Sequence, residues 1–415
     1  MKILHLCLSS PYNDGWGYQE NILTKYHAKL GNEVVLVATT LRNRTDGDGY
    51  EELDPREYYS DSVKIIRLPF RFQLIRKVMD RKASLLRTYK GLYSVLEREK
   101  PDLIFVHGFQ FLDLVKVVKY AKKSGVLVVA DTHASFYNSG TNLFSKYFLH
   151  KLIWRFIVRK CLPHIKRIFA VDLGCKLFAM QMYGIPEEKI DILPLGFDPD
   201  YVDIANQAQI SKRVRSRLGF RESDFVLITG GKMNREKNVH VLIRAFRSVE
   251  SSDLRLIIFG DMVEDVKRAV CKHIDEDERI KYIGWIDSKE IYEYFLASDV
   301  AVFPGSVSVL WPQAVGCGLP LVCKYWPGLV EHLDLGGNVV FLKGSTDEEL
   351  EKELTEVIQS LLSRSDMYAQ MRNISSVLGP KVFSYEDIAK RSILLVVLNG
   401  NSLGSETSSR TNYTG

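Results

Sequence analysis

Short apolar runs alternate with longer amphipathic stretches along almost the whole of this 415-residue chain. This alternation is typical of parallel strands joined by helices, and it predicts doubly wound α/β sheets. A chain of this length exceeds the ~250–300 residues at which a single hydrophobic core stops growing, so we expect two domains of similar size. The expected strands lie near residues 3–8, 34–39, 63–68, 103–106, 127–130, 168–171 and 190–193 in the first half, and near 225–229, 254–259, 281–284, 300–303, 321–323 and 339–342 in the second.

A segment that contains proline and glycine, residues 193–199, separates the two halves. Proline and glycine after a strand end regular structure and permit a turn. We therefore expect an N-terminal domain over residues 1–196 and a C-terminal domain over residues 197–382. A helix over residues 383–399 is expected to cross back to the N-terminal domain, and the polar tail 400–415 is expected to be disordered.

Basic residues are concentrated in the first half. The whole chain carries a formal charge of +5, with 56 Lys and Arg against 51 Asp and Glu. Residues 1–196 hold 30 of the basic and 20 of the acidic residues, which leaves 26 and 31 for the remainder. The basic half is therefore expected to face an anionic partner.

The cysteines and the apolar segments bear on the cellular location of the protein. Six cysteines are scattered without C-x-x-C spacing, and no cleavage site of a signal peptide follows the first apolar run. No apolar stretch approaches the ~20 residues of a membrane-spanning helix. We expect a cytoplasmic protein whose contact with the inner face of the plasma membrane is peripheral.

A glycine- and lysine-rich stretch is the most informative motif. Residues 230–238 read GGKMNREKN, after an expected strand and before a helical pattern. Gly231 permits a close approach of the backbone, and Lys232 and Lys237 can converge on a diphosphate and offset charge on a leaving group. The alternative is a solvated basic turn. The stretch resembles the donor-phosphate motif of family 4-like glycosyltransferases (glycosyl transferases group 1), in which an arginine stands where this chain has Lys232.

Further segments resemble the same family in the same order. Residues 193–198 (LPLGFD) are similar to its interdomain strand and turn. Gly260 and Gly284 follow two strands whose ends frame the nucleotide base in the family. The resemblance implies an α/β fold of the GT-B type, in which two Rossmann-like doubly wound domains face a central cleft, with the acceptor on the N-terminal domain and the nucleotide sugar on the C-terminal one.

Residues 303–320 (FPGSVSVLWPQAVGCGLP) resemble the donor loop and the helix that follows it. Small residues leave backbone amides free to bind sugar and phosphate oxygens. The family has two glutamates here, and no acid occurs between Asp299 and Glu331. Gln313 takes the position of the ribose-binding glutamate. Glu331 lies in a turn after the loop, where its carboxylate is expected to support the loop or to contact the sugar. A glutamate that begins a helix is the alternative. The expected donor-binding residues of this region are Gly305, Ser306, Val307, Ser308, Gln313 and Glu331.

Two parts of the N-terminal half are candidates for the opposite wall. The loop after the first strand contains Gly15 and Gly17, whose backbone amides can approach phosphate, although a plain structural turn is the alternative. His107 and His133 each follow an expected strand, and ligands of open α/β sheets collect at that end. By resemblance, His133 approaches the donor sugar near the reacting carbon, and His107 lines the acceptor side.

Metal and nicotinamide chemistry are less well supported. Asp-x-Asp spacings occur at residues 46–48, 198–200 and 275–277, in polar loops or at the hinge, and we expect all three at the surface. The two lysines are expected to supply the charge that a metal supplies in other sugar transferases, so no metal or cofactor is predicted. Neither half has a dinucleotide fingerprint, which disfavours an oxidoreductase.

Two basic segments carry interleaved aromatic residues, Arg67–Lys90 and Lys146–Arg167. In the second, Lys151, Arg155 and Arg159 recur at helical spacing beside Phe148 and Phe156. Cationic helices flanked by aromatics attract anionic lipid headgroups, so both segments are expected to contact a membrane. Aromatic residues in the core beside solvated lysines are the alternative, and nucleic acid is not the expected partner.

The resulting expectation is a retaining, metal-independent transferase. It would move a sugar from a nucleotide diphosphate to a glycan or a polyprenyl-linked acceptor in the synthesis of cell-surface polysaccharide. His133, Lys232 and Lys237 would carry the chemistry. The missing glutamates leave an alternative with the same fold, a catalytically weak sugar-binding or scaffold protein.

Overall fold

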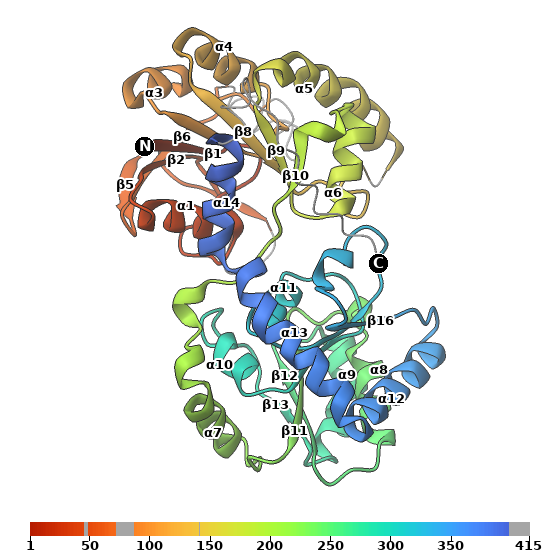
Figure 1. Ribbon diagram of the computed structural model, residues 1–415. Coiled ribbons are helices and arrows are strands. Elements are labelled where there is room, and N and C mark those ends of the chain that lie inside the picture. The colour runs from red at the N-terminus through yellow and green to blue at the C-terminus, as the bar shows by residue number, and fades with distance from the viewer. Residues whose placement is uncertain (45–48, 72–86, 141, 398–415) are drawn as a thin grey trace, which may run out of the picture.

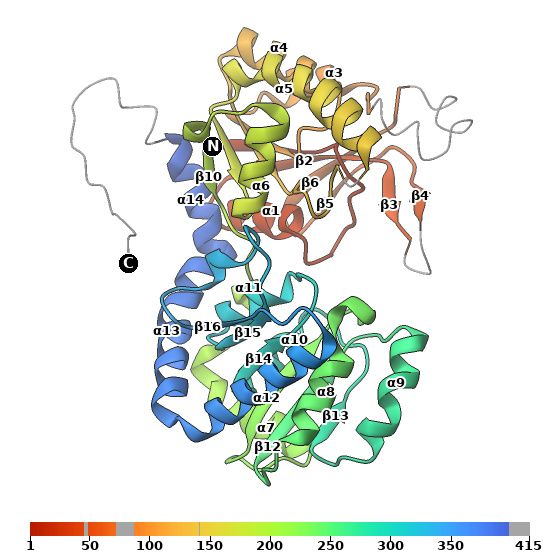
Figure 2. The same cartoon turned by 90° about the vertical axis from the view of Figure 1, so that its right-hand side faces the viewer.

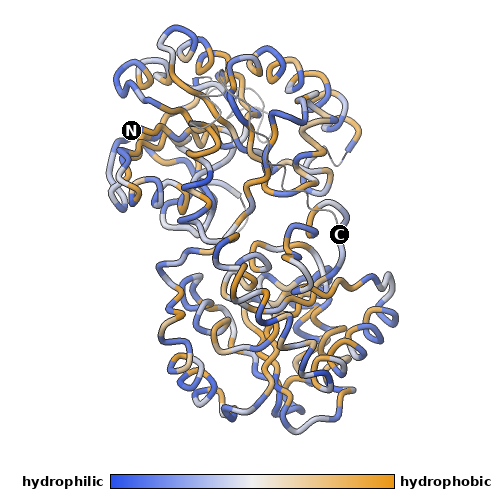
Figure 3. The backbone as a smooth tube through the Cα atoms, in the orientation of Figure 1, coloured by the Kyte–Doolittle hydropathy of each residue, from blue (hydrophilic) through white to orange (hydrophobic). Residues whose placement is uncertain are grey.

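Two parallel sheets, one above the other in Figure 1, form the two halves of the molecule. The computed structural model describes residues 1–44, 49–71, 87–140 and 142–397. The expected tail over residues 400–415 lies outside these residues. Hydrophobic residues concentrate in the strands at the centre of each half, and hydrophilic residues lie on the outer helices and loops (Figure 3).

The N-terminal sheet has the strand order β10-β9-β8-β7-β1-β2-β6-β5. All its neighbouring strands pair in parallel except β5, which runs antiparallel to β6 at the edge. Its central strands are buried apolar runs, as expected for a sheet with both faces covered. The strands are β1 (Lys2–Cys7), β2 (Glu33–Thr39), β5 (Glu57–Ser60), β6 (Val63–Leu68), β7 (Leu103–His107), β8 (Leu127–Thr132), β9 (Arg167–Ala170) and β10 (Ile190–Ile192).

The C-terminal sheet has six parallel strands in the order β13-β12-β11-β14-β15-β16. The order reverses direction between β11 and β14, and ligands of such sheets bind beside the carboxyl ends of the strands at that point. The strands are β11 (Phe225–Gly230), β12 (Leu254–Phe259), β13 (Ile280–Tyr282), β14 (Val300–Phe303), β15 (Leu321–Lys324) and β16 (Val339–Leu342).

Helices cover both faces of each sheet (Figures 1 and 2). The N-terminal domain carries α1 (Gln19–Lys29), α3 (Leu92–Glu99), α4 (Leu114–Ser124), the π-helix η2 (Phe144–Trp154), α5 (Arg155–Cys161), α6 (Leu173–Phe178) and the π-helix η4 (Ala179–Tyr183). The C-terminal domain carries α7 (Gln207–Arg217), the short 3-10 helix η8 (Arg235–Lys237), α8 (Val239–Ser248), α9 (Glu264–Asp275), α10 (Ile291–Leu296), α11 (Leu310–Gly316), the 3-10 helix η9 (Glu331–Leu333), α12 (Asp347–Ser363) and α13 (Ser365–Phe383). None of the helices in the described ranges has both the length and the hydrophobicity needed to cross a bilayer.

Two chain segments cross between the domains side by side. The N–H of Phe197 donates to the carbonyl of Phe383 at 2.9 Å, and the N–H of Tyr385 donates to the carbonyl of Phe197 at 3.1 Å. A Cβ atom on Gly196 would lie 2.0 Å from the Phe383 oxygen, so only glycine permits this approach. The last helix, α14 (Tyr385–Val397), lies against α1 of the N-terminal domain, with Ile388 fully buried (Figures 1 and 2).

The Asp198-Pro199-Asp200 turn fastens this junction to α1. Asp198 accepts a hydrogen bond from the Tyr26 hydroxyl at 2.6 Å, and Lys25 pairs with Asp198 at 2.7 Å and with Asp200 at 2.6 Å. Asp198 is buried, contrary to the expected surface position, because the two domains meet over it. In the spacing over residues 275–277, Asp277 pairs with Arg279, and residues 46–48 belong to the segment 45–48 that lies outside the described ranges.

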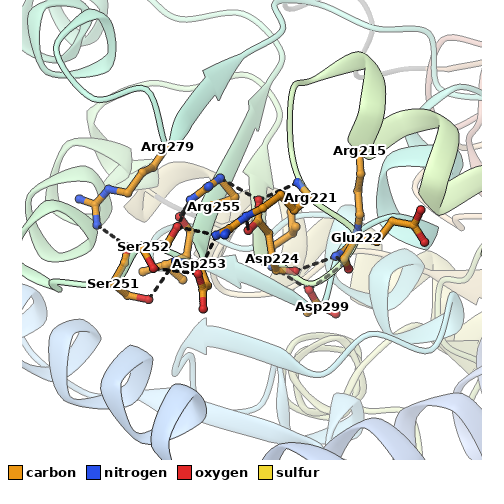
Figure 4. Close-up of polar contacts among 12 residues, drawn as sticks. Arg215, Arg221, Glu222, Asp224, Ser251, Ser252, Asp253, Arg255, Arg279 and Asp299 are labelled. Atoms are coloured by element: carbon orange, nitrogen blue, oxygen red, sulfur yellow. Dashed lines mark hydrogen bonds and ion pairs between the residues drawn. The ribbon is translucent and has the colours of Figure 1, made fainter.

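A buried ionic network closes the far end of the C-terminal sheet (Figure 4). Arg215 pairs with Asp299 at 2.9 Å and donates to the carbonyls of Ala297 and Asp224 at 2.9 and 2.7 Å. The Asp224 carboxylate is itself paired with Arg221 and Arg255, at 2.8 and 3.0 Å. These groups stand before the amino ends of β11 and β12, away from the carboxyl ends, so the network stabilises the domain and not a ligand.

Three short strands and one helix geometry differ from the sequence expectation. The antiparallel pair β3 (Leu41–Asn43) and β4 (Tyr50–Glu52) and the edge strand β5 were not predicted, because they are polar, half-exposed and too short for a clear period. The segment expected to have α-helical spacing begins as the π-helix η2 and becomes α-helical only at Arg155. A π-helix has a wider turn, so residues four apart do not align on one face within η2.

Candidate active site

A cleft of about 590 Å³ lies between the two domains. The larger part of its wall belongs to the N-terminal domain, including Gly17, His107 and His133 of the residues predicted from the sequence. Gly196 of the crossing segment also lines it, and the C-terminal domain contributes Val309 and Gln313. The other predicted residues lie outside the lining of this cleft, and they are placed individually below.

His133 stands just beyond the carboxyl end of β8, with 41% of its side chain exposed to the cleft. Its Nε2 lies 3.8 Å from Oδ1 of Asp131, the buried carboxylate two residues earlier in the same strand. Burial alone would lower the pKa of His133, but the Asp131 carboxylate, supported by Glu20 and Asp172, outweighs it and raises the pKa. The cleft therefore presents an imidazole that is readily protonated.

His107 is the first member of a chain of buried hydrogen bonds. Its Nδ1 lies 2.5 Å from Oδ2 of Asp131, and its Nε2 lies 2.9 Å from Nδ1 of His5. The chain continues from His5 Nε2 to His27 Nδ1 at 3.0 Å and from His27 Nε2 to the Ser392 hydroxyl of α14 at 2.9 Å. Both ring nitrogens of His107 are thus engaged inside the protein, so His107 borders the cleft without a free nitrogen for an acceptor.

Burial sets the charge of these groups. It lowers the pKa of His5 well below its ordinary value, with smaller contributions from His27 and His107, and it lowers the pKa of His27 to about 3. Burial would raise the pKa of Asp131, but His107 and His133 outweigh it and hold the pKa well below the ordinary range. At neutral pH the Asp131 carboxylate faces His133 and His107, and the two histidines farther along the chain, His5 and His27, are neutral.

Sequence reasoning missed Asp131, His5 and His27. Each lies within an apolar or amphipathic run, so its polar side chain was read as part of an element and not of a site. Asp131 carried one usable signal, because a charged residue near the end of a buried strand needs partners. His133, two residues later, could be recognised as one of these partners.

Arg67, near the end of β6, fixes the loop that follows β1 through contacts with Tyr12 and Asp14. This fully buried guanidinium pairs with Asp14 at 2.8 Å and donates to the carbonyls of Thr39 and Tyr12 at 2.9 and 3.2 Å. Gly15 has a φ of +72°, which favours glycine, but it does not border the cleft as Gly17 does. Arg67 was expected on an exposed basic face, and the structure corrects this, because every donor direction points into the protein.

Outside the cleft lining, three predicted glycines of the C-terminal domain meet at the carboxyl ends of β11, β12 and β13. The N–H of Gly260 donates to the carbonyl of Gly284 at 2.6 Å, and the N–H of Gly231 donates to that of Phe259 at 3.0 Å. A Cβ atom on Gly260 would lie 2.1 Å from the Gly231 oxygen, and both residues have φ near +100°. The close approach requires glycine at residue 260, and the positive φ favours glycine at residue 231.

Lys237 is attached to the donor loop. Its ammonium group donates to the carbonyls of Ser306 and Val307 at 2.7 and 3.2 Å, and the N–H of Ser306 donates to the carbonyl of Glu236 at 2.9 Å. A Cβ atom on Gly305 would lie 2.2 Å from that Glu236 oxygen, which explains the glycine. Burial lowers the pKa of Lys237, although Glu236 opposes it.

The remaining donor residues are arranged differently. Lys232 is exposed, and no hydrogen bond or ion pair among the described residues includes it. The Ser308 hydroxyl accepts from the N–H of Leu310 at 3.3 Å, at the start of α11. Gln313, in the next turn of α11, is 9% exposed and borders the cleft.

Glu331 fastens its own turn. Its carboxylate accepts hydrogen bonds from the Tyr325 hydroxyl at 2.9 Å and from the N–H groups of Gly328 and Val330 at 2.8 and 3.2 Å. Burial would raise the pKa of Glu331, but these donors outweigh it and lower the pKa. The turn also meets the N-terminal domain, since the N–H of Gly174 donates to the Gly328 carbonyl at 2.5 Å.

Of the two basic segments, the second lies at the surface and most of the first lies outside the described residues. Residues 72–86 are not described, and Arg87 borders the cleft instead of an outer face, which corrects its expected position. In the second segment Trp154 is buried. The helices η2 and α5 and the residue before them expose large apolar side chains, up to 75% in Leu143 and 70% in Phe156, and the others are Phe144, Tyr147, Phe148 and Leu152.

The described residues show no group of three His, Cys, Asp or Glu side chains arranged to hold a metal ion. Two Rossmann-like domains that close a cleft, with a domain junction crossed twice, define the GT-B architecture. Anabaena HepE in complex with UDP and glucose has this fold: it superposes with a TM-score of 0.59 at 17% identity, over 96% of this chain and 100% of that one.

Comparison with protein families agrees with the fold. Residues 22–201 match Glycosyltransferase Family 4, and residues 211–374 match Glycosyl transferases group 1. The chain belongs to the group 1 glycosyltransferases of the GT-B class.

Two relatives differ in how much of their length is matched. The alpha-monoglucosyldiacylglycerol synthase of Acholeplasma laidlawii is 23% identical over 82% of this chain and 88% of its own length. An uncharacterised glycosyltransferase of Methanocaldococcus jannaschii is 22% identical over 40% of this chain, and the match spans 44% of that protein. At these identities the relatives support the class of enzyme and leave the substrates open.

Proposed function

We propose that this glycosyltransferase moves a sugar from a nucleotide diphosphate to a lipid-linked acceptor or a glycan, with retention at the anomeric carbon and without a metal. The observation that carries the proposal is the cleft itself. It brings His133, paired with Asp131, opposite α11 and Gln313 at the end of the donor loop. The relative from Anabaena, whose structure holds UDP and glucose, supports a nucleotide-sugar donor.

Charge stabilisation is the proposed chemistry on the C-terminal wall. Lys237 and Lys232 would neutralise the departing diphosphate, and the N–H groups of the loop from Gly305 to Ser308 would bind donor oxygens. Lys237 now donates to two loop carbonyls. A diphosphate is a stronger partner for an ammonium group than a carbonyl, so donor binding is expected to draw Lys237 away from them.

Orientation is the proposed role of the N-terminal wall. Asp131 holds His133 at the cleft and favours its protonated form. An imidazolium can donate to a hydroxyl of the donor sugar and fix it for attack. Gln313 would accept hydrogen bonds from the ribose, without the charge assistance of the glutamate that the family has there.

One specific observation favours a second candidate, a catalytically weak sugar-binding or scaffold protein. Gln313 replaces one acid of the donor site, and Glu331, the nearest acid that follows the loop, is occupied by its own turn. The two candidates differ in turnover. Release of nucleotide diphosphate from UDP-, GDP- and ADP-sugars, with and without an extract of lipid acceptors, supports the enzyme. Binding of a nucleotide sugar without any release supports the scaffold.

A membrane-facing surface belongs to the same proposal. The aromatic and leucine side chains exposed on η2 and α5 stand among Lys146, Lys151, Arg155 and Arg159. Such a surface can insert its apolar groups at the headgroup level and attract anionic lipids. The synthase from Acholeplasma laidlawii is named for a glycolipid product, which is compatible with a lipid acceptor. We therefore propose that the enzyme works at the inner face of the plasma membrane in cell-surface glycoconjugate synthesis.

Sedimentation with vesicles tests the surface. The protein is expected to pellet with phosphatidylglycerol-containing vesicles and much less with pure phosphatidylcholine. Phe148→Ser and Phe156→Ser together should reduce the pelleted fraction, whereas Val377→Ser, an exposed apolar residue on α13, should leave it unchanged. Equal recovery of the wild type from both vesicles would argue against a membrane role.

A further inference from the structure

Arg87 is a partly buried cation that has no acidic partner among the described residues. It borders the cleft on the N-terminal side, and its Nη1 donates to the backbone carbonyl of Gln110 at 3.0 Å. No ion pair within the described ranges includes Arg87. Burial lowers the pKa of its guanidinium, and the groups that oppose this effect are tyrosines, not carboxylates.

Two other arginines, which the fold buries more completely, have counterions. Arg67 pairs with Asp14 at 2.8 Å, and Arg215 pairs with Asp299 at 2.9 Å. A charge removed from water without a counterion destabilises the fold, so such groups are normally paired. Arg87, in contrast, lies in the ligand cleft without a counterion among the described residues, at a place where a ligand can supply an anion.

The backbone at Arg87 is also held in an unusual conformation. Its φ is +26°, a region that residues other than glycine rarely adopt. Two residues later, the N–H of Tyr89 donates to the Asp113 carboxylate at 2.8 Å and its hydroxyl donates to the Leu8 carbonyl at 2.5 Å. These bonds fix the segment, and strain maintained in this way is typical of a ligand-binding position.

Neutral polar groups stand beside Arg87. The Tyr183 hydroxyl lies 2.8 Å from Nδ1 of His150 and accepts a hydrogen bond from the Gln110 amide at 3.1 Å. Burial lowers the pKa of His150 to about 4, and the charge of Arg87 adds to the effect. At neutral pH this corner of the cleft holds one positive charge and uncharged donors, and an anion can enter it without repulsion.

The corner is continuous with the surface that we propose for the membrane. Leu149, His150 and Trp154 of η2 border the cleft, while Tyr147, Phe148 and Leu152 of the same helix are exposed outside. One helix therefore separates the lipid-facing surface from the Arg87 corner.

We propose that Arg87 and His150 form a subsite for the phosphate of a lipid-linked acceptor, whose hydrocarbon part lies along η2. The inference rests on the proposed function and names the chemical class of its acceptor. A neutral glycan supplies only hydroxyl groups and leaves the charge of Arg87 uncompensated. The diphosphate of the donor belongs to the opposite wall, with Lys237.

Calorimetric titration of the full-length protein tests the subsite with three probes: farnesyl diphosphate, inorganic pyrophosphate and farnesol. The wild type should bind farnesyl diphosphate most tightly, and Arg87→Gln should weaken it about tenfold or more, because charge-assisted hydrogen bonds are lost. Arg87→Lys should fall between the two, since a lysine keeps the charge but not the fork of donors. Lys90→Gln removes an exposed cation three residues away and should change nothing.

Two further measurements distinguish the subsite from the donor wall and from a purely structural role of Arg87. In the Lys237→Gln background, where a diphosphate no longer has that lysine as a partner, Arg87→Gln should still weaken the binding of farnesyl diphosphate about tenfold, because the two residues lie in different places. The melting temperature of Arg87→Gln should fall by no more than the loss of one hydrogen bond explains, since within the described ranges the substitution breaks the bond to the Gln110 carbonyl and no ion pair. A larger loss of stability together with lost binding would mark Arg87 as structural and overturn the proposal.

Three outcomes contradict the proposal directly. Equal affinity of wild type and Arg87→Gln for farnesyl diphosphate overturns the subsite. Farnesol bound as tightly as the diphosphate overturns the role of phosphate, and pyrophosphate bound as tightly as farnesyl diphosphate overturns the lipid. Failure of the proposed function shows itself differently, as the absence of any nucleotide binding by the wild type.

Discussion

The two walls of the cleft are built in different ways. On the N-terminal wall, Asp131 is held by a chain of buried hydrogen bonds that ends at Ser392 of the last helix, and it lies 3.8 Å from His133. On the C-terminal side, behind the residues that line the cleft, Lys237 is attached to the donor loop and Lys232 is exposed. The first wall is preformed, whereas the second must exchange internal contacts for those of a ligand, so substitutions on the two walls should fail differently.

The largest expected effect is on the C-terminal wall. Lys237→Met removes both the support of the loop and the charge near the diphosphate, so we expect the release of nucleotide diphosphate to slow roughly 100-fold or more. Lys232→Met removes only a charge and should cost less. Lys267→Met, an exposed lysine on α9, is the control and should match the wild type. Equal losses of activity in Lys232→Met and Lys237→Met would contradict the claim that Lys237 also supports the donor loop.

The next largest effect belongs to His133. His133→Ala is expected to slow turnover by about 10- to 100-fold, with the affinity for nucleotide alone unchanged, because the imidazole orients the sugar. If the protonated form is active, turnover falls as pH rises through the pKa of His133. Asp131→Asn removes the group that raises this pKa and should move the fall to lower pH. An unchanged pH profile in Asp131→Asn would contradict the claim that Asp131 sets the pKa of His133.

The buried histidines predict an effect on stability. The folded pKa of His27 is about 3, below the value of 6.5 expected in the unfolded chain. The unfolded state therefore binds the proton first as pH falls below 6.5, and the free energy of unfolding should fall by up to ~1.4 kcal/mol per pH unit from this residue. His27→Gln should flatten that slope in urea denaturation between pH 7 and pH 5. If the free energy of unfolding of His27→Gln depends on pH as steeply as that of the wild type, groups other than His27 cause the loss of stability.

The smallest effect should come from restoring an acid to the donor site. Gln313→Glu or Pro312→Glu is expected to tighten the binding of a nucleotide sugar by up to about tenfold, because a carboxylate accepts from ribose hydroxyls more strongly than an amide. Gln313 is the better position, since it borders the cleft. Calorimetry with no gain for either variant would remove the idea that these positions replace the lost glutamates.

Much of the fold follows from the sequence because buried parallel strands leave a strong pattern. Every strand expected in the C-terminal half is present, since each is a short apolar run bounded by turns. The polar strands β3, β4 and β5 left no such pattern. The glycines at residues 231, 260 and 305 were recognised by the resemblance of their segments to the family. The structure gives the reason for residues 260 and 305, a backbone approach closer than any Cβ atom permits, and for residue 231 a φ of +111°.

Less of the site was predictable, because burial is a property of the folded chain. Spacing alone indicated that Arg67 and Arg87 belong to a basic face, yet the fold turns Arg67 toward Asp14 and Arg87 into the cleft. His5 and His27 gave no signal, since a histidine within a strand or helix has no pattern of its own. Their meaning depends on contacts between β1, β7, α1 and α14, which no local pattern encodes.

The central claim, a nucleotide-sugar site that depends on Lys237, is tested most directly by thermal denaturation with UDP, GDP, ADP and their common sugars. Ligand that binds only the folded state raises its stability. We expect at least one nucleotide diphosphate to raise the melting temperature of the wild type and of Lys267→Met, and to raise that of Lys237→Met far less. Stabilisation by none of these ligands, or equal stabilisation of Lys237→Met, would contradict the claim.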